Sequence, residues 1–358
     1  MKRIVLGLSD GVDSAVAAHL LKASGYDVLG VYLINAGERE LDAARKNAEE
    51  AGITFESLDI RAELKEKVCI PFVDEYLAGR TPSPCPGCNR DVKLNSLIRR
   101  ADELGIEEVA TGHYVIKRDG ALYMGDPECD QSYMLCMLKR AQLDRLVLPL
   151  GGYAKREVRN IAKQLGLSCA DKPDSRENCF IRDMDYASYI RINCPSRLKG
   201  AGEALFHGEP FDVHEGIYAY TVGQRWKRDR EGRRLYVSRI DPGKNRIELC
   251  LWEELFTREV DIGNVSWLTE PPRCGEIPAR IRIRHTRWET PDCALTIEGS
   301  RVRVVTQTPL RAPAPGQIAA LYSENRLIGG GVVESVAADH PMRKANDGYS
   351  DGKYAKLK

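Results

Sequence analysis

Short β-branched runs alternate with amphipathic helical stretches over the first two hundred residues of the chain. The run at 3–6 precedes a helical pattern at 15–22, and the run at 28–32 precedes another at 41–51. A third run, at 53–58, again leads into a helical segment. This alternation is typical of βαβ units, so we expect a parallel sheet covered by helices.

A further strand is expected at 108–110, directly before Thr111-Gly112-His113-Tyr114. Parallel sheets bind ligands beyond the carboxyl ends of their strands. The polar residues that follow this strand are therefore expected to face a binding site.

The pattern changes beyond about residue 200. Helical periodicity fades there, and short alternating strands are separated by turns that contain Gly, Pro and Asp. Two mostly β modules fit this pattern, with a boundary near Pro271-Pro272. The polar, Gly- and Lys-containing segment from Asp339 onward is expected to be a loose tail.

Composition narrows the class of protein. The chain has 358 residues, 43% of them hydrophobic, enough for two or three domains with cores of their own. No apolar stretch has the length of a signal peptide or a membrane span, so no membrane partner is expected. Eleven cysteines without an export signal indicate a reducing compartment, which predicts a cytoplasmic location. Because the net charge is only +1, any nucleic-acid surface must arise from local clustering.

A candidate phosphate loop follows the first expected strand. Ser9-Asp10-Gly11-Val12-Asp13-Ser14 leads directly into the apolar helix at 15–21. A strand, loop and helix in this order direct backbone N–H groups and a helix N-terminus at an anion, for which pyrophosphate is the expected guest. No Gly-Lys-Ser/Thr follows, which excludes a Walker-type loop. The alternative is a turn with a favourable helix cap and no ligand.

A second candidate site lies around two cysteines. Cys85 and Cys88 are spaced as Cys-x-x-Cys in a proline-rich stretch that enters a helix, so Cys88 is expected near a helix N-terminus with a lowered pKa. The spacing alone leaves open half a zinc site, a redox dithiol or part of an iron–sulfur site. Cys179, in a polar loop-like stretch, is either a third functional thiol or a buried small hydrophobe.

Several further segments complete a pattern that resembles a known family. They are Ala110-Thr111-Gly112-His113-Tyr114, Asp130-Gln131-Ser132-Tyr133, Pro149-Leu150-Gly151, Lys155-Arg156-Glu157-Val158-Arg159, Glu177-Asn178-Cys179-Phe180-Ile181, Tyr220-Thr221-Val222-Gly223-Gln224-Arg225 and Ala314-Pro315-Gly316-Gln317. With the loop and the cysteine pair, their order and spacing resemble the tRNA-specific 2-thiouridylases (the MnmA/TrmU family), which are ATP pyrophosphatases. The resemblance extends to about residue 337.

The resemblance implies an α/β protein with a division into domains. Residues 1–199 would form a Rossmann-like ATP pyrophosphatase catalytic domain with a parallel sheet, and 200–265 a small, mostly β central domain that contacts tRNA. Residues 266–337 would form a C-terminal β-barrel, and 338–358 a flexible tail.

It also implies roles for individual residues. Cys88 would be the nucleophile and Cys179 the carrier of a persulfide. The ATP site would comprise Gly7, Leu8, Ser9, Asp10, Gly11, Val12, Asp13, Ser14, Leu33 and Gly112. Contacts with tRNA would come from Ser83, Pro84, Cys85, His113, Cys129, Asp130, Gln131, Arg284, His285 and Gln317.

Four positions depart from the family pattern. Asp10 replaces a loop glycine, and an acid beside phosphates is unfavourable unless it points away or meets a magnesium ion. Cys85, Cys129 and His285 stand where many relatives have Asp, a basic residue and Tyr. With Cys85, the expected site holds three thiols, so an iron–sulfur cluster on Cys85, Cys88 and Cys179 is an alternative to a plain persulfide mechanism.

Two basic clusters could contact RNA phosphates. Arg280, Arg282 and Arg284 alternate with isoleucines, which places all three on one strand face. The segment 225–234 carries six basic residues against two acidic ones. A solvated sheet face is the alternative to RNA contact.

The resemblance implies a transferase that uses ATP and Mg²⁺ to adenylate the 2-oxygen of the wobble uridine in tRNA and replaces it with persulfide sulfur. The partners would be tRNA and a protein that donates sulfur. The alternatives are an iron–sulfur-dependent thiolase of the same fold, an amidating ATP pyrophosphatase and a tRNA-binding protein without catalysis.

Overall fold

The structure is a computed structural model that describes the chain except at residues 36, 39, 174–177, 272–275, 285–289 and 337–358. The expected tail at 338–358 and His285 lie outside the described residues.

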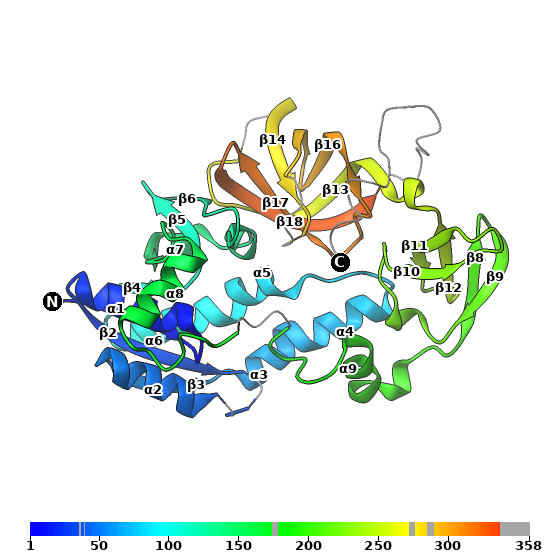
Figure 1. Ribbon diagram of the computed structural model, residues 1–358. Helices are drawn as coiled ribbons and strands as arrows, with labels where there is room; N and C mark the ends of the chain where they lie inside the picture. The colour runs from blue at the N-terminus through cyan, green and yellow to red at the C-terminus, as the bar shows by residue number, and fades with distance from the viewer. Residues whose placement is uncertain (36, 39, 174–177, 272–275, 285–289, 337–358) are drawn as a thin grey trace.

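The N-terminal region contains a parallel sheet in the order β3-β2-β1-β4-β7 (Figure 1). Its central strand pairs with both neighbours, so that Val5 lies beside Leu29 on one side and Val109 on the other. The strands are β1 (Lys2–Leu8), β2 (Tyr26–Ile34), β3 (Thr54–Asp59), β4 (Glu108–Ala110) and β7 (Leu146–Val147). The expected parallel α/β sheet is confirmed.

Helices cover both faces of this sheet. Ile4, Leu6 and Leu8 pack with α1 (Val12–Ala23) and α8 (Lys155–Gln164), whereas Val5 packs with α6 (Leu94–Glu103) on the opposite face. The strand is apolar on both sides because both sides are buried, as in other α/β sheets. Helix α2 (Leu41–Ala51) contacts α1 and β3.

A chain of short helical segments leads away from the sheet (Figure 1). It comprises α3 (Arg61–Leu64), the π-helical turn η1 (Lys65–Cys69), α4 (Ile70–Leu77), α5 (Pro84–Cys88), the π-helical turn η2 (Asn89–Lys93) and then α6. Segments α5, η2 and α6 follow one another without a break from Pro84 to Glu103. Helix α9 (Tyr186–Asn193) lies near α4, and Tyr186 stacks on Tyr76.

The middle of the chain forms a second sheet in the order β10-β11-β12-β8-β9. Its strands are β8 (Gly202–Phe206), β9 (Glu209–His214), β10 (Arg225–Arg228), β11 (Arg234–Asp241) and β12 (Arg246–Cys250). Strands β12 and β8 are parallel and the other neighbours are antiparallel. The expected small β module is therefore present.

The C-terminal strands form a closed barrel. The order is β13-β16-β15-β14-β17-β18, and β13 also pairs with β18. The strands are β13 (Phe256–Trp267), β14 (Glu276–Arg282), β15 (Asp292–Glu298), β16 (Arg301–Arg311), β17 (Ile318–Ser323) and β18 (Arg326–Val336). The boundary that the resemblance implies between 265 and 266 falls inside β13. Because β13 pairs with both β16 and β18, the barrel already begins at Phe256.

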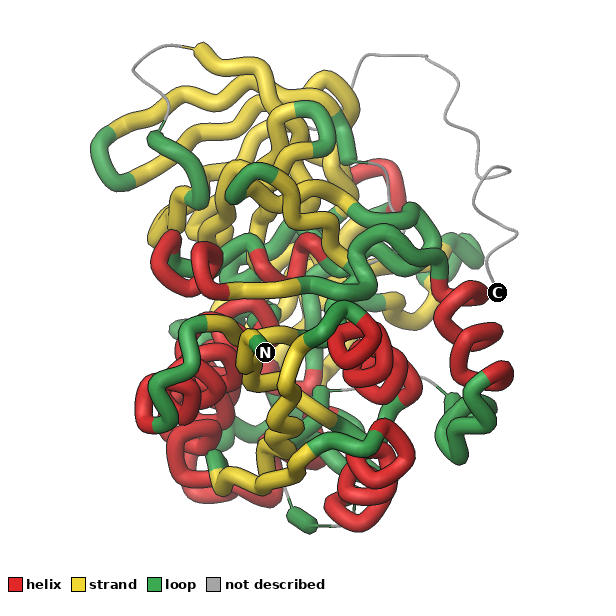
Figure 2. The backbone as a smooth tube through the Cα atoms, turned by 90° about the vertical axis from the view of Figure 1, so that its left-hand side faces the viewer, coloured by secondary structure: helices red, strands yellow, loops and turns green. Residues whose placement is uncertain are grey.

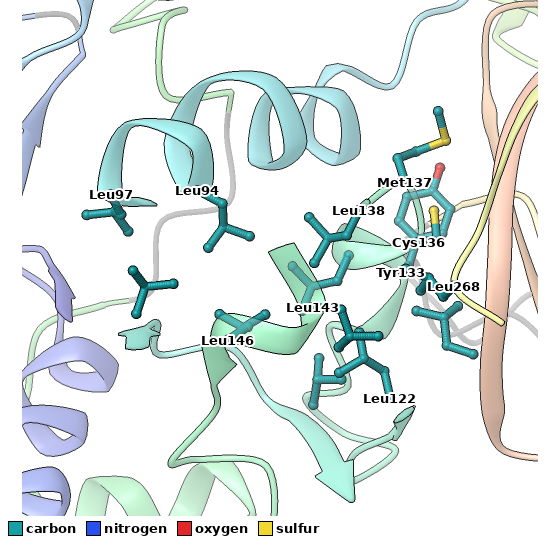
Figure 3. Packing of buried hydrophobic residues seen from close by; sticks show 14 of the residues in the cluster. Leu94, Leu97, Leu122, Tyr133, Cys136, Met137, Leu138, Leu143, Leu146 and Leu268 are labelled. Carbon is teal, nitrogen blue, oxygen red and sulfur yellow. The ribbon is translucent and has the colours of Figure 1, made fainter. Parts of the chain in front are cut away.

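The barrel is attached to the N-terminal α/β region by a hairpin and by a shared core. Strands β5 (Val115–Arg118) and β6 (Ala121–Met124) extend the barrel sheet, because β6 pairs with β18. Figure 3 shows Leu94 and Leu97 of α6, Leu122 of β6 and Leu268 after β13 within this core. Figure 2 shows the barrel above the N-terminal sheet. No helix in the described part of the chain is both long and apolar enough to span a membrane.

Candidate active site

A cavity of about 600 Å³ opens at the carboxyl ends of β1, β2 and β4. The residues expected for ATP that line it are Gly7, Leu8, Ser9, Asp10, Asp13, Ser14, Leu33 and Gly112. Cys179 and Lys93 line the same cavity. Segments that are far apart in the sequence therefore share one site.

Serine hydroxyls hold the loop between β1 and α1 in shape. The hydroxyls of Ser9 and Ser14 lie 2.9 Å apart, and Ser9 N donates to Ser14 Oγ at 2.9 Å. Gly11 N donates to Ser9 Oγ at 3.1 Å, and Gly11 caps α1. The N-terminus of a twelve-residue helix thus faces the cavity, as an anion site requires.

Asp13, in the first turn of α1, is fixed by two partners. Tyr114 donates its hydroxyl to Asp13 Oδ1 at 2.5 Å, and Lys155 Nζ lies 2.7 and 2.8 Å from the two carboxylate oxygens. This cluster ties α1 to the end of β4 and to the start of α8, so the loop is held from two sides.

Asp10, the unusual acidic residue of the loop, forms an ion pair with Lys172. Its carboxylate is therefore matched by a cation that the chain itself supplies. This pairing explains how the loop accommodates an acid where the family pattern has a glycine.

Gly112 allows the end of β4 to approach the loop closely. A Cβ atom added at Gly112 would lie 3.2 Å from both Asp13 C and Ser14 N. These are backbone atoms, which cannot turn aside as a flexible side chain can. Position 112 therefore requires glycine, because the first turn of α1 packs against it too closely for a side chain.

The thiols gather next to the cavity. Cys85 Sγ lies 3.8 Å from Asn178 Oδ1, which places α5 against the segment that carries Cys179. Cys88 is 5% exposed and packs in a cluster that includes Phe180. Cys88 and Cys179 are also close enough to interact electrostatically. All ten cysteines of the described residues are free thiols.

The expected lowering of the Cys88 pKa is wrong. Burial raises the pKa of this thiol to about 12, and the opposing effect of Lys93 is smaller. Cys88 ends α5 and continues into η2, so it lies inside a helical run and not at its N-terminus. Burial likewise raises the pKa of Cys85.

Among the described residues, no three His, Cys, Asp or Glu side chains are placed to hold one metal ion. Cys85, Cys88 and Cys179 in this arrangement therefore do not form a site for a single metal ion. Asp10 and Asp13 line the cavity but are paired with Lys172 and Lys155.

The residues expected to contact tRNA divide into several places. His113 and Gln131 line the main cavity, and Ser83 and Pro84 begin α5 beside Cys85. Arg284 and Gln317 line a second cavity of about 440 Å³, together with 221–224. The structure thus places four of these residues in two cavities, and Ser83, Pro84 and Cys85 at the start of α5.

Two further residues that are expected to contact tRNA, Cys129 and Asp130, have partners within the protein. Cys129 Sγ lies 3.9 Å from Tyr153 O, and burial raises the pKa of this thiol to about 11. Asp130 is buried and accepts hydrogen bonds from Gly125 N and Ser132 Oγ. Arg282 Nη1 lies 2.6 Å from Asp130 Oδ2.

The two basic clusters differ in exposure. In the first, Arg282 is engaged by Asp130, and Arg284 donates to Ala312 O at 2.7 Å. Burial lowers the pKa of Arg284. In the second cluster all six basic side chains are exposed. The hairpin of β10 and β11 is therefore the more open basic surface.

Sequence reasoning missed three lysines of the site. Lys155 and Lys172 pair with the two acids of the loop, and Lys93 lies beside the thiols. Lys155 belongs to the family segment Lys155-Arg156-Glu157-Val158-Arg159, so its place at the site could have been predicted from the resemblance. Lys93 and Lys172 carry no local signal, since their partners come from distant segments.

The fold combines a parallel sheet that carries a phosphate-type loop with a closed β-barrel, and thiols lie next to the loop. This combination is typical of enzymes that use a nucleotide. Residues 2–183 match the tRNA methyl transferase HUP domain, and residues 257–333 match the aminomethyltransferase beta-barrel domain. These two matches cover the sheet domain and the barrel.

Curated relatives identify the family. The tRNA-specific 2-thiouridylase MnmA 1 of Clostridium tetani is 37% identical over 352 residues, which is 94% of this chain and 97% of that protein. MnmA 2 of Caldanaerobacter subterraneus subsp. tengcongensis is 37% identical over 355 residues, with 93% and 98% coverage. MnmA of Clostridium botulinum strain Alaska E43 is 35% identical over 355 residues, with 94% and 98% coverage. The chain belongs to the tRNA-specific 2-thiouridylase family, as expected from its motifs.

Proposed function

We propose that this chain is an ATP-dependent tRNA-uridine 2-sulfurtransferase that makes 2-thiouridine at the wobble position. The observation that carries the proposal is the shared cavity, which Cys179 lines together with Ser9, Asp10, Asp13 and Ser14 of the loop. A nucleotide-activating loop and a sulfur carrier can then act on one pyrimidine.

Activation by ATP supplies a leaving group. The 2-oxygen of uridine is a poor leaving group, so direct displacement by sulfur is slow. The loop and the N-terminus of α1 would hold the triphosphate while the oxygen attacks the α-phosphate and pyrophosphate departs. Magnesium would be carried mainly by the phosphates, as is usual for this ion, and would neutralise their charge. AMP then leaves with the oxygen.

Sulfur transfer follows at the thiols. A persulfide on Cys179 attacks C2 of the activated ring with its terminal sulfur, and the C–O bond to AMP breaks. The Cys88 thiolate then attacks Sγ of Cys179 and breaks the S–S bond, leaving the electron pair on the sulfur of the product. A disulfide between Cys88 and Cys179 results, which a dithiol reductant restores to two thiols.

The persulfide route needs only Cys88 and Cys179, and the alternative is an iron–sulfur cluster on Cys85, Cys88 and Cys179. Anaerobic iron and sulfide analysis of the purified protein tests it. Stoichiometric iron and sulfide would replace the persulfide route by a cluster route.

The proposed partners follow from the reaction. Transfer RNA is the substrate, and a protein that carries sulfane sulfur must load Cys179. Because the cycle depends on reduced thiols and tRNA, we place it in the cytoplasm.

The test compares Cys179→Ser with Cys194→Ser in thiolation of unmodified tRNA. Cys194 is a matched control, because its thiol donates to Ile190 O at 3.1 Å and a serine hydroxyl can replace that bond. We expect Cys179→Ser to lose 2-thiouridine formation but to keep tRNA-dependent pyrophosphate release, and Cys194→Ser to keep both. Thiolation by Cys179→Ser would refute the sulfur route. Failure of the unaltered protein to release pyrophosphate from ATP with tRNA would indicate a binding protein instead.

A further inference from the structure

A π-helical turn brings Lys93 to the side of the helical run that carries the thiols. The turn η2, Asn89–Lys93, separates Cys88 from α6. In a regular α-helix, residues five apart point about 140° away from each other. A π-helical turn makes i→i+5 hydrogen bonds, which bring residues five apart, such as Cys88 and Lys93, closer to one face. Turns of this kind are frequent at functional sites.

The ionisable groups that act on Lys93 are thiols, not carboxylates. Its side chain lines the cavity, and the groups that interact with its charge are Cys179, Cys88 and Cys85. Cys85 and Cys88 belong to α5, and Cys179 belongs to the segment that begins at residue 178. Among the described residues, Lys93 has no ion pair or hydrogen bond from its side chain.

The acids of the cavity are matched by other cations. Asp10 pairs with Lys172, Asp13 with Lys155, and Glu40 with Arg182 at 2.9 Å. Asp183 also lines the cavity and has contacts of its own. Lys93 is therefore a partly buried cation on which thiols are the ionisable groups that act, and no carboxylate among the described residues pairs with it.

We propose that Lys93 is the charge partner of the reacting sulfurs, and that its ammonium group stabilises the thiolate of Cys88 and the anionic sulfur on Cys179. The inference rests on the proposed function for the identity of the reacting atoms. Cys88 gives its proton to water and attacks as a thiolate, while Lys93 stays protonated throughout and acts only through its charge.

The physical need for such a partner is set by burial. Burial raises the pKa of Cys88 to about 12, and the positive charge of Lys93 is the largest influence that opposes this rise. The other titratable groups that act on Cys88 are Cys179, Cys85 and Cys69, and each of them raises its pKa further when ionised. Loss of the ammonium group removes the opposing influence, so less thiolate forms at any pH below that value.

The test measures thiol reactivity, which does not require tRNA. Alkylation of Cys88 and Cys179 by iodoacetamide is followed by mass spectrometry from pH 7 to 9.5 in the full-length protein. Lys93→Met keeps the length of the side chain and removes the charge, and Lys93→Arg keeps the charge. The control is Lys67→Met, in the neighbouring π-helical turn, where Lys67 pairs with Glu63 at 2.7 Å.

We expect Lys93→Met to lower the alkylation rates about tenfold, since one unit of thiol pKa corresponds to a tenfold change in thiolate. Lys93→Arg should recover most of the rate, and Lys67→Met should match the unaltered protein. The melting temperature of Lys93→Met should not fall, because the substitution removes a partly buried charge that has no counter-ion among the described residues.

Unchanged alkylation in Lys93→Met would overturn the inference. Weaker ATP binding by that variant with unchanged alkylation would assign Lys93 to the nucleotide instead. The two proposals fail separately, because lower alkylation in a protein that makes no thiouridine would keep the charge relationship and refute only the proposed function.

Discussion

Asp10 and Lys172 are 162 residues apart in the chain and form an ion pair at the edge of the phosphate loop. Both side chains are partly exposed. The pair places a carboxylate beside the expected position of the nucleotide phosphates and neutralises it there. Lys172, from a distant part of the sequence, thus balances the charge of Asp10, the acid that distinguishes this loop.

Removal of Lys172 alone should weaken ATP binding. Lys172→Met leaves the Asp10 carboxylate uncompensated near the phosphates, and like charges at such distances cost about 1 kcal/mol even in water. We therefore expect roughly five- to tenfold weaker ATP binding by calorimetry. The double variant Asp10→Gly/Lys172→Met should bind ATP about as well as the unaltered protein. Equal weakening in both variants would mean that Lys172 contacts the nucleotide directly.

Gly112 should tolerate no side chain without a shift of the loop. Gly112→Ala places a Cβ 3.2 Å from the backbone of Asp13 and Ser14, so the first turn of α1 must move. We expect at least about tenfold weaker ATP binding, because a small misplacement of a binding group costs much of its interaction energy. Gly152→Ala is the control, since a Cβ there meets nothing within 4 Å. Normal ATP binding by Gly112→Ala would show that the loop adapts at little cost.

Much of the fold could be predicted from the pattern of the sequence. The strand β1 is apolar on both faces, and the loop residues follow it directly, so local sequence defines both the sheet and the phosphate-type loop. The proximity of Cys179 to the loop could be expected only from the resemblance to a family, since no local pattern relates positions so far apart.

Other features depend on tertiary structure that no local pattern encodes. The pKa of Cys88 is raised because the chain buries it, although the sequence places it close to the start of a helix. The hairpin of β5 and β6 joins the barrel sheet from within the catalytic domain, so domain boundaries drawn along the chain miss this connection. Lys172, the ion-pair partner of Asp10, lies 162 residues further along the chain, so no local pattern could relate the two.

The high pKa of Cys88 predicts a pH dependence for disulfide formation. The pKa lies well above neutrality, so the thiolate is a small fraction that grows about tenfold with each pH unit up to about pH 12. In a single turnover, formation of the Cys88–Cys179 disulfide should therefore accelerate about tenfold from pH 7 to pH 8, and again to pH 9. Quenched samples analysed by mass spectrometry give this rate. A rate independent of pH over this range would mean that deprotonation of Cys88 does not limit the step.

The ion pair of Asp130 and Arg282 should contribute to stability. The two side chains are 2% and 12% exposed, and the pair joins the barrel strand β14 to the catalytic domain. Removal of one partner from a buried pair leaves an uncompensated charge, which typically costs about 3–5 kcal/mol. Arg282→Met should lower the free energy of unfolding by about 3 kcal/mol in urea.

Lys46→Met is the matched control for this pair, because Lys46 forms an exposed pair with Glu50 at 3.9 Å. Its effect should remain below about 1 kcal/mol. Asp130→Asn distinguishes the two roles of Asp130. Loss of tRNA binding with unchanged stability would favour the direct tRNA contact that the family resemblance implies.

The hairpin of β10 and β11 offers the last prediction, on RNA binding. Arg225 and Arg230 are exposed, and neither has a side-chain ion pair or hydrogen bond among the described residues. Exposed guanidinium groups of this kind contact phosphates and release counterions. Arg225→Ala/Arg230→Ala should therefore weaken tRNA binding and reduce the slope of log K against log salt by about two. Lys46→Ala, which removes an exposed cation from α2, should leave the slope unchanged. If the double variant keeps the full slope, the hairpin is a solvated sheet face, and the phosphate contacts must come from other basic residues.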